Sequence, residues 1–253
     1  MMNDTNTKEL TTQGFLEKYK AQIAAALPKH MTVERVMRIV FSELRKTPRL
    51  GECDPKSLLS SVIQASLLGL NIGGIIGECY LVPFKKECQF ILGYKGMLAL
   101  AYRNLKVKSV AAHCVYANDF FEFEYGANPY LRHSPNIEGP RGALKCVYAV
   151  CILDGNNPLF EVLSLEDVNK AKSQSKTSNF GPWVNHFDEM AMKTAIRRLF
   201  KYMPISIELQ TAIALDEAAD DGRQGEVIEH DLNIGTEEEE GKTKSDEISD
   251  ILG

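Results

Sequence analysis

Residues 170–203 read KAKSQSKTSNFGPWVNHFDEMAMKTAIRRLFKYM, and they contain seven basic side chains, two acidic ones and the only tryptophan of the protein. In the second half of this stretch, apolar residues recur at the spacing of one helical face, which predicts a helix packed against a core. The residues of this face are Met192, Ile196, Leu199 and Met203.

The opposite face of the predicted helix is basic. Lys193, Arg197 and Lys201 stand four residues apart, and Thr194 and Arg198 flank them. We expect this basic stripe (Lys193, Arg197 and Lys201) to lack carboxylate partners within its own helix and to face an open groove. Replacing any one of the three with Gln should then leave the melting temperature nearly unchanged.

The loop before the helix, KTSNFGPW at residues 176–183, places Phe180 and Trp183 among basic and small polar residues. Single-stranded nucleic acid binding requires cations that contact the phosphates and aromatic rings on which the bases stack. A second reading is a solvated basic face with both aromatics capping a core. Trp183 follows Pro182 and precedes the helix, so it can also pack as a hydrophobic staple.

Charge divides the chain of 253 residues into a basic body and an acidic end. Fourteen acidic and three basic residues give residues 216–253 a net charge of −11, which leaves +6 on residues 1–215 because the whole chain carries −5. We therefore predict a disordered N-terminus at residues 1–12, one folded domain at 13–215 and a disordered acidic tail at 216–253. A chain ended near Ala219 should keep its fold.

The cysteine pattern and the apolar runs indicate a cytoplasmic protein. The six cysteines form no CxxC pair and no zinc-ligand spacing with histidine, so we expect buried, reduced thiols. No apolar run is long enough for a signal peptide or a membrane span.

The order of elements indicates an α+β fold, with an antiparallel sheet and packed helices. Apolar spacing predicts helices at residues 15–27, 31–45 and 54–68. A hairpin at 79–92 and a helix at 97–103 follow, and then strands at 107–116, 120–125, 144–153 and 159–163. Sequential strands with short turns favour antiparallel pairing.

No sequence motif predicts a catalytic, cofactor or metal site. The glycine-rich stretch at residues 73–77 lacks the Lys-Ser/Thr of a phosphate-binding loop and follows no strand, so we read it as a turn. The carboxylates of the body are scattered, which argues against a metal-dependent nuclease. Asp188 and Glu189 lie in the first turn of the predicted helix, where the helix dipole accounts for them.

Five motifs, in order, resemble the RecT family of phage and prophage single-strand annealing recombinases. Four of them are AALPKHM at residues 25–31, GLNI at 69–72, YLVPF at 80–84 and ILGYKG at 91–96. The fifth, GPWVNHFDEMAMKTAIRRLFKY at 181–202, is the longest and most specific. The resemblance covers roughly residues 14–217.

The resemblance implies ATP-independent annealing of complementary single strands, with strand invasion in some members, by a protein without covalent catalysis or a cofactor. It also implies a core similar to Rad52-type annealing proteins and rings or helical filaments on DNA. The expected partners are a phage 5′→3′ exonuclease and the host single-strand-binding protein. The main alternative is a single-stranded DNA-binding protein that does not anneal; an exonuclease or helicase subunit is a weaker one.

The DNA-binding groove implied by the resemblance combines a strand and turn near residue 90 with the loop and basic helix near residue 190. Its residues are Gln89, Tyr94, Lys95, Lys176, Phe180, Trp183, Lys193, Thr194, Arg197, Arg198 and Lys201.

Overall fold

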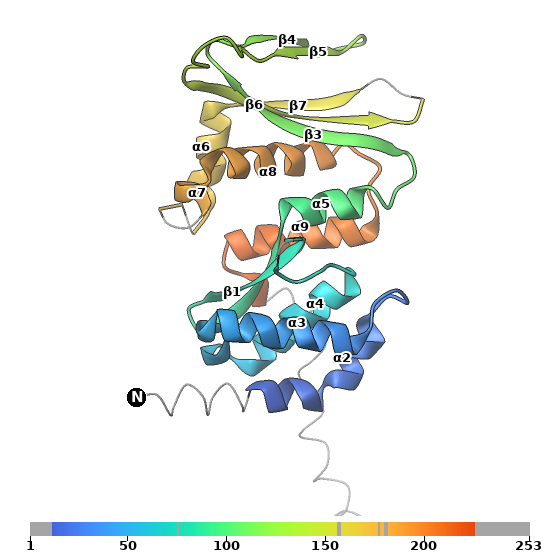
Figure 1. Cartoon of the computed structure of the whole chain (residues 1–253). Coiled ribbons are helices and arrows are strands. Elements are labelled where there is room, and N and C mark those ends of the chain that lie inside the picture. Colours follow the sequence, from blue (N-terminus) through green and yellow to red (C-terminus); the bar gives the residue numbers. More distant parts are fainter. Residues whose placement is uncertain (1–11, 75, 156–157, 177, 180–181, 226–253) are drawn as a thin grey trace, which may run out of the picture.

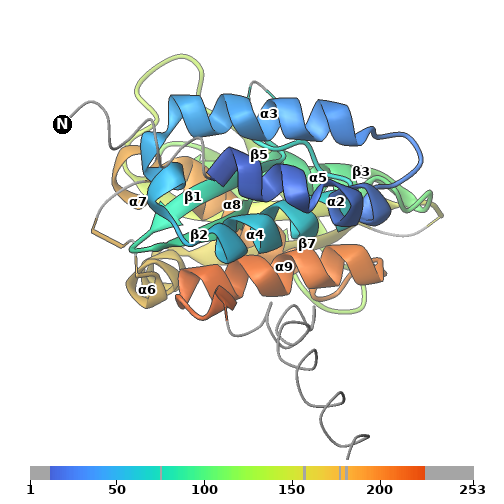
Figure 2. The same cartoon turned by 90° about the horizontal axis from the view of Figure 1, so that it is seen from below.

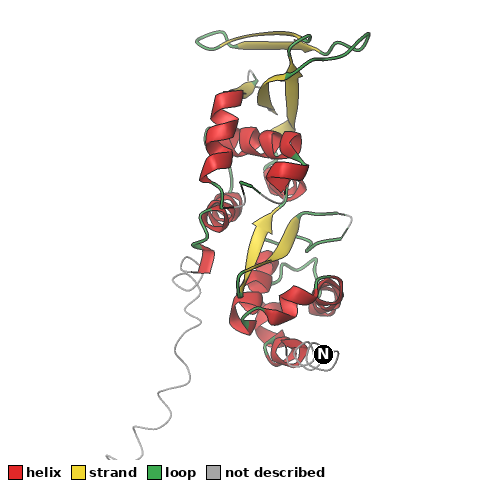
Figure 3. Ribbon diagram, turned by 90° about the vertical axis from the view of Figure 1, so that its left-hand side faces the viewer, coloured by secondary structure: helices red, strands yellow, loops and turns green. Residues whose placement is uncertain are grey.

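The structure, a computed structural model, describes residues 12–74, 76–155, 158–176, 178–179 and 182–225. The predicted disorder of residues 1–11 and of 226–253 lies outside these described residues, as does Phe180. Helices form one end of the molecule and a sheet forms the other, with α5 (Tyr94–Ala101) and α9 (Ile207–Asp220) between them (Figure 1). Figure 3 shows the same layers from the side.

The helical end is built around α4 (Pro55–Leu67), whose nine residues from Leu58 to Ser66 are buried. It begins as its sequence predicts, because Pro55 occupies the first turn and the Asp54 carboxylate accepts a hydrogen bond from Ser57 N at 2.9 Å. Helix α2 (Lys20–Ala26) packs beside it, and α3 (Val33–Lys46) contacts α2 and the 3₁₀ helix η1 (Pro48–Glu52). Figure 2 shows that the axes of α3 and α9 are roughly parallel.

The predicted hairpin is confirmed as β1 (Cys79–Phe84) paired antiparallel with β2 (Glu87–Leu92). One face of the hairpin is buried through Leu81, Phe90 and Leu92, and α4 and α9 both contact β2. The first turn of α5 needs glycine, because a Cβ at Gly96 would overlap the backbone oxygen of Glu78. This close approach gives a physical reason for the glycines of the ILGYKG motif.

The sheet end consists of three antiparallel strands in the order β3 (Val107–Tyr116), β6 (Leu144–Leu153) and β7 (Leu159–Ser164). Helices α6 (Leu165–Gln174) and α8 (Phe187–Phe200) cover one face, and the short α7 (Pro182–Asn185) precedes α8 (Figure 1). The hairpin of β4 (Phe120–Glu124) and β5 (Tyr130–Ser134) lies over the other face. There Phe121 stacks on Tyr148, with ring centroids 5.5 Å apart.

The antiparallel α+β class and the predicted strands are therefore confirmed, whereas β5, α6 and α9 were not predicted. The six cysteines are buried and free, as expected, and burial raises the pKa of the Cys88 thiol to about 12. Within the described ranges, no helix has both the length and the apolar character needed to cross a membrane.

The predicted end of the domain at residue 215 is corrected by α9, which runs on to Asp220. Asp216 and Gln224 are both 1% exposed, so the folded part of the chain reaches at least this far. The boundary at 215 differs from the structure because it assigns every acidic residue after 215 to a solvated tail. Several of them instead face cations of α8. A chain ended near Ala219 would lose the Arg197–Asp220 pair and the hydrogen bonds of Gln224 to Phe90.

Candidate nucleic-acid interface

Helix α8 has the apolar face that its sequence predicts. Ile196 and Leu199 are 0% and 1% exposed, Met203 is buried, and Met192 is half-buried against the core. These side chains pack toward β3, β6 and β7. The position of the basic stripe follows, because residues four apart on the other face of α8 must point away from the sheet.

The basic stripe does not face an open groove, because α9 supplies its carboxylate partners. Lys193 Nζ lies 2.9 Å from Asp216 Oδ2, and Arg197 donates to Asp216 at 2.6 Å and to Asp220 at 3.0 Å. Lys193 is buried at 7% exposure, and the Arg197 side chain is 15% exposed.

The expectation that Gln at any stripe position leaves stability unchanged is therefore corrected for Lys193 and Arg197. Burial lowers the pKa of Arg197, but the Asp216 and Asp220 carboxylates outweigh this and hold it above its ordinary value. Glu189, four residues before Lys193, contacts His186 instead, at 4.0 Å. Because the partners lie 19 to 23 residues away along the chain, helical spacing within α8 could not reveal them.

Asp216 connects α8 to the hairpin. Its Oδ1 accepts hydrogen bonds from Lys193 Nζ and from the backbone N–H of Leu92 in β2, both at 3.0 Å. One carboxylate thus links β2, the strand that carries Gln89, to the basic stripe of α8. The predicted turn residues Tyr94 and Lys95 instead form the start of α5. Gln89 is buried, whereas Tyr94 and Lys95 are exposed.

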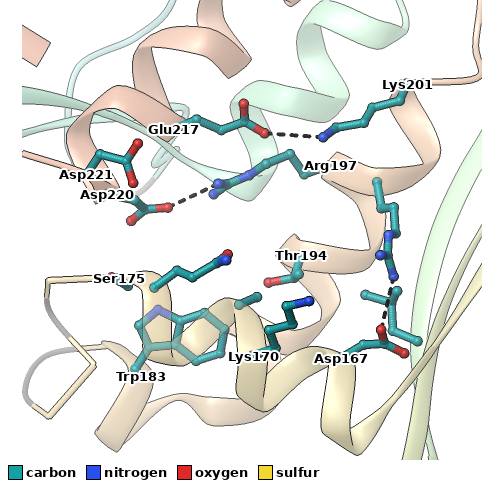
Figure 4. Close-up of a pocket in the computed structure, with 14 residues that line it drawn as sticks. Asp167, Lys170, Ser175, Trp183, Thr194, Arg197, Lys201, Glu217, Asp220 and Asp221 are labelled. Carbon is teal, nitrogen blue, oxygen red and sulfur yellow. Dashed lines mark hydrogen bonds and ion pairs between the residues drawn. The ribbon is translucent and has the colours of Figure 1, made fainter. Parts of the chain in front are cut away.

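A hollow of about 390 Å³ lies between α6, α8 and α9 (Figure 4). Its lining includes Trp183 and Thr194, and Thr194 Oγ1 donates to the Met190 carbonyl at 2.8 Å. Four cations and four carboxylates also line it. They are Lys170, Arg197, Arg198 and Lys201, and Asp167, Glu217, Asp220 and Asp221.

The exposed cations of this region form a basic rim, which we define as Lys170, Lys176, Arg198 and Lys201. Arg198 and Lys201 have side chains 48% and 63% exposed, and their contacts are long, at 3.5 Å to Asp167 and 3.9 Å to Glu217. Lys170 and Lys176 are exposed, and the Lys176 backbone N–H donates to the Asp220 carbonyl. Such solvated cations can exchange a weak partner for a phosphate.

Trp183 packs in the core instead of offering its ring to solvent. It is 4% exposed, and its ring lies 6.0 Å from that of Phe187. The structure thus agrees with the core-packing alternative for this residue, while a contact of Trp183 with a base stays a prediction. Trp183 Nε1 and Arg197 Nε are buried without a hydrogen-bond partner among the described residues, and both side chains line the hollow.

A second polar cluster, missed in the sequence, lies at the start of the β4–β5 hairpin, next to the end of β3. The Asp119 carboxylate accepts from Arg141 Nη2 at 2.5 Å, from the backbone N–H of Tyr116 and Asn136, and lies 3.2 Å from His133 Nε2. The Arg141 guanidinium holds the pKa of Asp119 well below its ordinary value. These contacts tie the hairpin to the sheet, and we assign the cluster a structural role.

No group of three or more potential metal ligands occurs in the part of the chain that the structure describes.

Comparison with known proteins agrees with the motifs. The RecT family model matches residues 34–231. The chain is 47% identical over 206 residues to Protein RecT of Escherichia coli (strain K12), covering 78% of this chain and 76% of that protein. It is 30% identical over 184 residues to the uncharacterized protein YqaK of Bacillus subtilis (strain 168), covering 69% and 61%. The chain belongs to the RecT family.

Proposed function

We propose that the protein binds single-stranded DNA and anneals complementary strands, without ATP, in phage-type homologous recombination. Membership of the RecT family supports recombination by strand annealing. The observation that carries the proposal on this chain is the basic rim of Lys170, Lys176, Arg198 and Lys201, which stays exposed beside α8.

The rim supplies what annealing requires physically. Two DNA strands repel each other, so cations that neutralise phosphates allow them to approach. Contacts to phosphates carry no sequence information, and they leave the pairing edges of the bases free. Base pairing provides the free energy, so no covalent catalysis is needed.

The interface that we propose differs from the one expected for the basic stripe. Arg198 and Lys201 bind phosphates together with Lys170 and Lys176, and Tyr94 and Lys95 extend the contact surface on the hairpin side. Lys193 supports the interface from within, because its charge is already matched by Asp216. Roles for Gln89, Phe180, Trp183 and Thr194 in DNA contact remain part of the proposal.

The same proposal includes assembly and partners. The protein forms rings or helical filaments on DNA, so that many weak sites act along one strand. Its core is similar to Rad52-type annealing proteins, and it works in the cytoplasm with a 5′→3′ exonuclease and the host single-strand-binding protein. Strand invasion is a further activity within this proposal.

An annealing assay distinguishes the proposal from its alternatives. Two complementary oligonucleotides are incubated with the protein, without ATP or metal, and the products are separated on a gel after the protein is removed. Duplex forming faster than in buffer supports annealing. Unchanged single strands with a shifted protein–DNA band indicate a single-stranded DNA-binding protein, and shortened strands indicate a nuclease.

A matched pair of variants assigns the activity to the rim. Lys170, Arg198 and Lys201 are replaced together with Gln in one variant, and Lys29, Arg38 and Lys56 in the control. The control cations are also exposed but lie on the helical end of the molecule. Both variants lose three positive charges, so a general effect of net charge would weaken both equally. Because only the first variant changes the rim, only that variant should bind single strands weakly. Equal losses would reject the rim as the DNA-binding surface.

A further inference from the structure

The hollow between α6, α8 and α9 is electrostatically balanced, since its four cations face four carboxylates. A phosphate that enters it adds negative charge to side chains whose formal charges already cancel. Entry is therefore favourable only if one carboxylate gives up its cation. The structure shows which carboxylates can do so.

Asp216 is fixed, whereas Asp220 can be exchanged. Asp216 is 1% exposed and accepts from Lys193, Arg197 and the Leu92 N–H, so releasing it would leave a buried charge unpaired. The Asp220 carboxylate contacts Arg197 Nη1 at 3.0 Å, and its side chain is 32% exposed. Water can solvate Asp220 as soon as it leaves Arg197.

We propose that Asp220 is an exchangeable internal counter-ion for the DNA-binding site. A backbone phosphate displaces the Asp220 carboxylate from Arg197 Nη1 and is held in the hollow by Arg197 together with Arg198 and Lys201. Asp216 stays bound to Arg197 Nη2 and keeps the guanidinium in place. This inference rests on the proposed function, since it requires a nucleic-acid phosphate as the ligand.

The exchange makes each DNA contact weaker than the number of cations suggests. Part of the free energy of the new phosphate contact is spent on breaking the Arg197–Asp220 pair. A strand held by many such contacts can shift its register at low cost, and annealing needs this because two strands must search for their complementary alignment. Asp220 therefore lowers affinity and keeps the bound strand movable.

The test compares Asp220→Asn with Glu124→Gln. The Asn side chain keeps the size of Asp and can still accept a hydrogen bond from Arg197. Glu124 is exposed on β4, over the far face of the sheet, so its variant removes the same charge away from the hollow. Affinity for a mixed-sequence single-stranded oligonucleotide is measured for wild type and both variants across a salt series.

We expect Asp220→Asn to bind about two- to fivefold more tightly at low salt, the effect of removing one partly exposed charge pair. The slope of log K against log salt should become steeper, by at most about 0.7, because phosphate binding no longer returns a free carboxylate to solution. Glu124→Gln should keep the wild-type slope. Identical slopes and affinities for the two variants would overturn the inference.

Two further measurements keep the result interpretable. If the wild-type protein shows no salt-dependent binding, the proposed function itself fails. If the wild-type protein binds and Asp220→Asn leaves that binding unchanged, only the inference about Asp220 fails. If Asp220→Asn lowers the melting temperature, Glu217→Gln tests the same exchange at Lys201, whose contact is long and exposed. A slope unchanged by Glu217→Gln would then count against the exchange.

Discussion

Gln224 and Phe90 exchange two hydrogen bonds in the way that neighbouring β-strands do. The Gln224 Oε1 accepts from Phe90 N at 2.7 Å, and its Nε2 donates to Phe90 O at 2.6 Å. One side chain after α9 thus satisfies the outer edge of β2, and Asp216 does the same for the N–H of Leu92. An unpaired strand edge promotes pairing with other chains, and the side chains of Gln224 and Asp216 cover this edge of β2.

Replacing Gln224 with Ala should lower the free energy of unfolding by about 1–3 kcal/mol, because it leaves buried backbone groups of Phe90 without partners. Denaturant unfolding monitored by circular dichroism measures the loss. Two chains shortened at the C-terminus, one with Gln224 and one without it, provide the control. A chain ended after Gly225 should unfold like the full protein, whereas one ended after Ala219 should be clearly less stable. Equal stability of the two shortened chains would contradict this role of Gln224.

Replacing Arg197 with Gln should cost about 3 kcal/mol of stability, because it removes a buried partner of Asp216. Replacing Lys201 with Gln should cost less than about 1 kcal/mol, since its pair with Glu217 is exposed and 3.9 Å long. Thermal melts of the two variants under one set of conditions give the comparison. Equal melting temperatures would mean that the contacts of Arg197 with α9 contribute little.

Replacing Leu199 with Ala should lower the free energy of unfolding by about 2–5 kcal/mol, because the side chain is 1% exposed in the core beneath the sheet. Val184→Ala on α7 is the matched control. Its side chain is 55% exposed, so the change should be small. A near-wild-type Leu199→Ala would show that α8 does not pack on the sheet through this face.

Acid should weaken the sheet end through Asp119. Its pKa is held below the ordinary value of 3.8, first by Arg141, so the folded state binds fewer protons than the unfolded state as the pH falls through this range. The stabilisation is complete above pH 3.8 and is lost progressively below it. Asp119→Asn should therefore flatten the dependence of stability on pH below about 4. Parallel curves for wild type and variant would exclude Asp119 as a source of acid sensitivity.

The local elements and the family can be read from short stretches of the sequence. Short-range patterns specified α4 with its Asp54 cap, the β1–β2 hairpin and the apolar face of α8. The cap and the apolar face depend on residues within about four positions of one another, and the hairpin depends on two adjacent strands joined by a short turn. The glycines of ILGYKG and the long motif at residues 181–202 identified the family for the same reason. They are contiguous and can be read without knowing what lies beside them.

Which cations are available to a ligand depends on how the helices pack against one another. Lys193 and Lys201 look equivalent along α8, yet one is buried against Asp216 and the other is exposed. The difference arises from α9, whose carboxylates lie 16 to 23 residues further along the chain and reach α8 only after the fold brings the two helices together. Charge pairing acts through space, and spacing along one helix cannot reveal it.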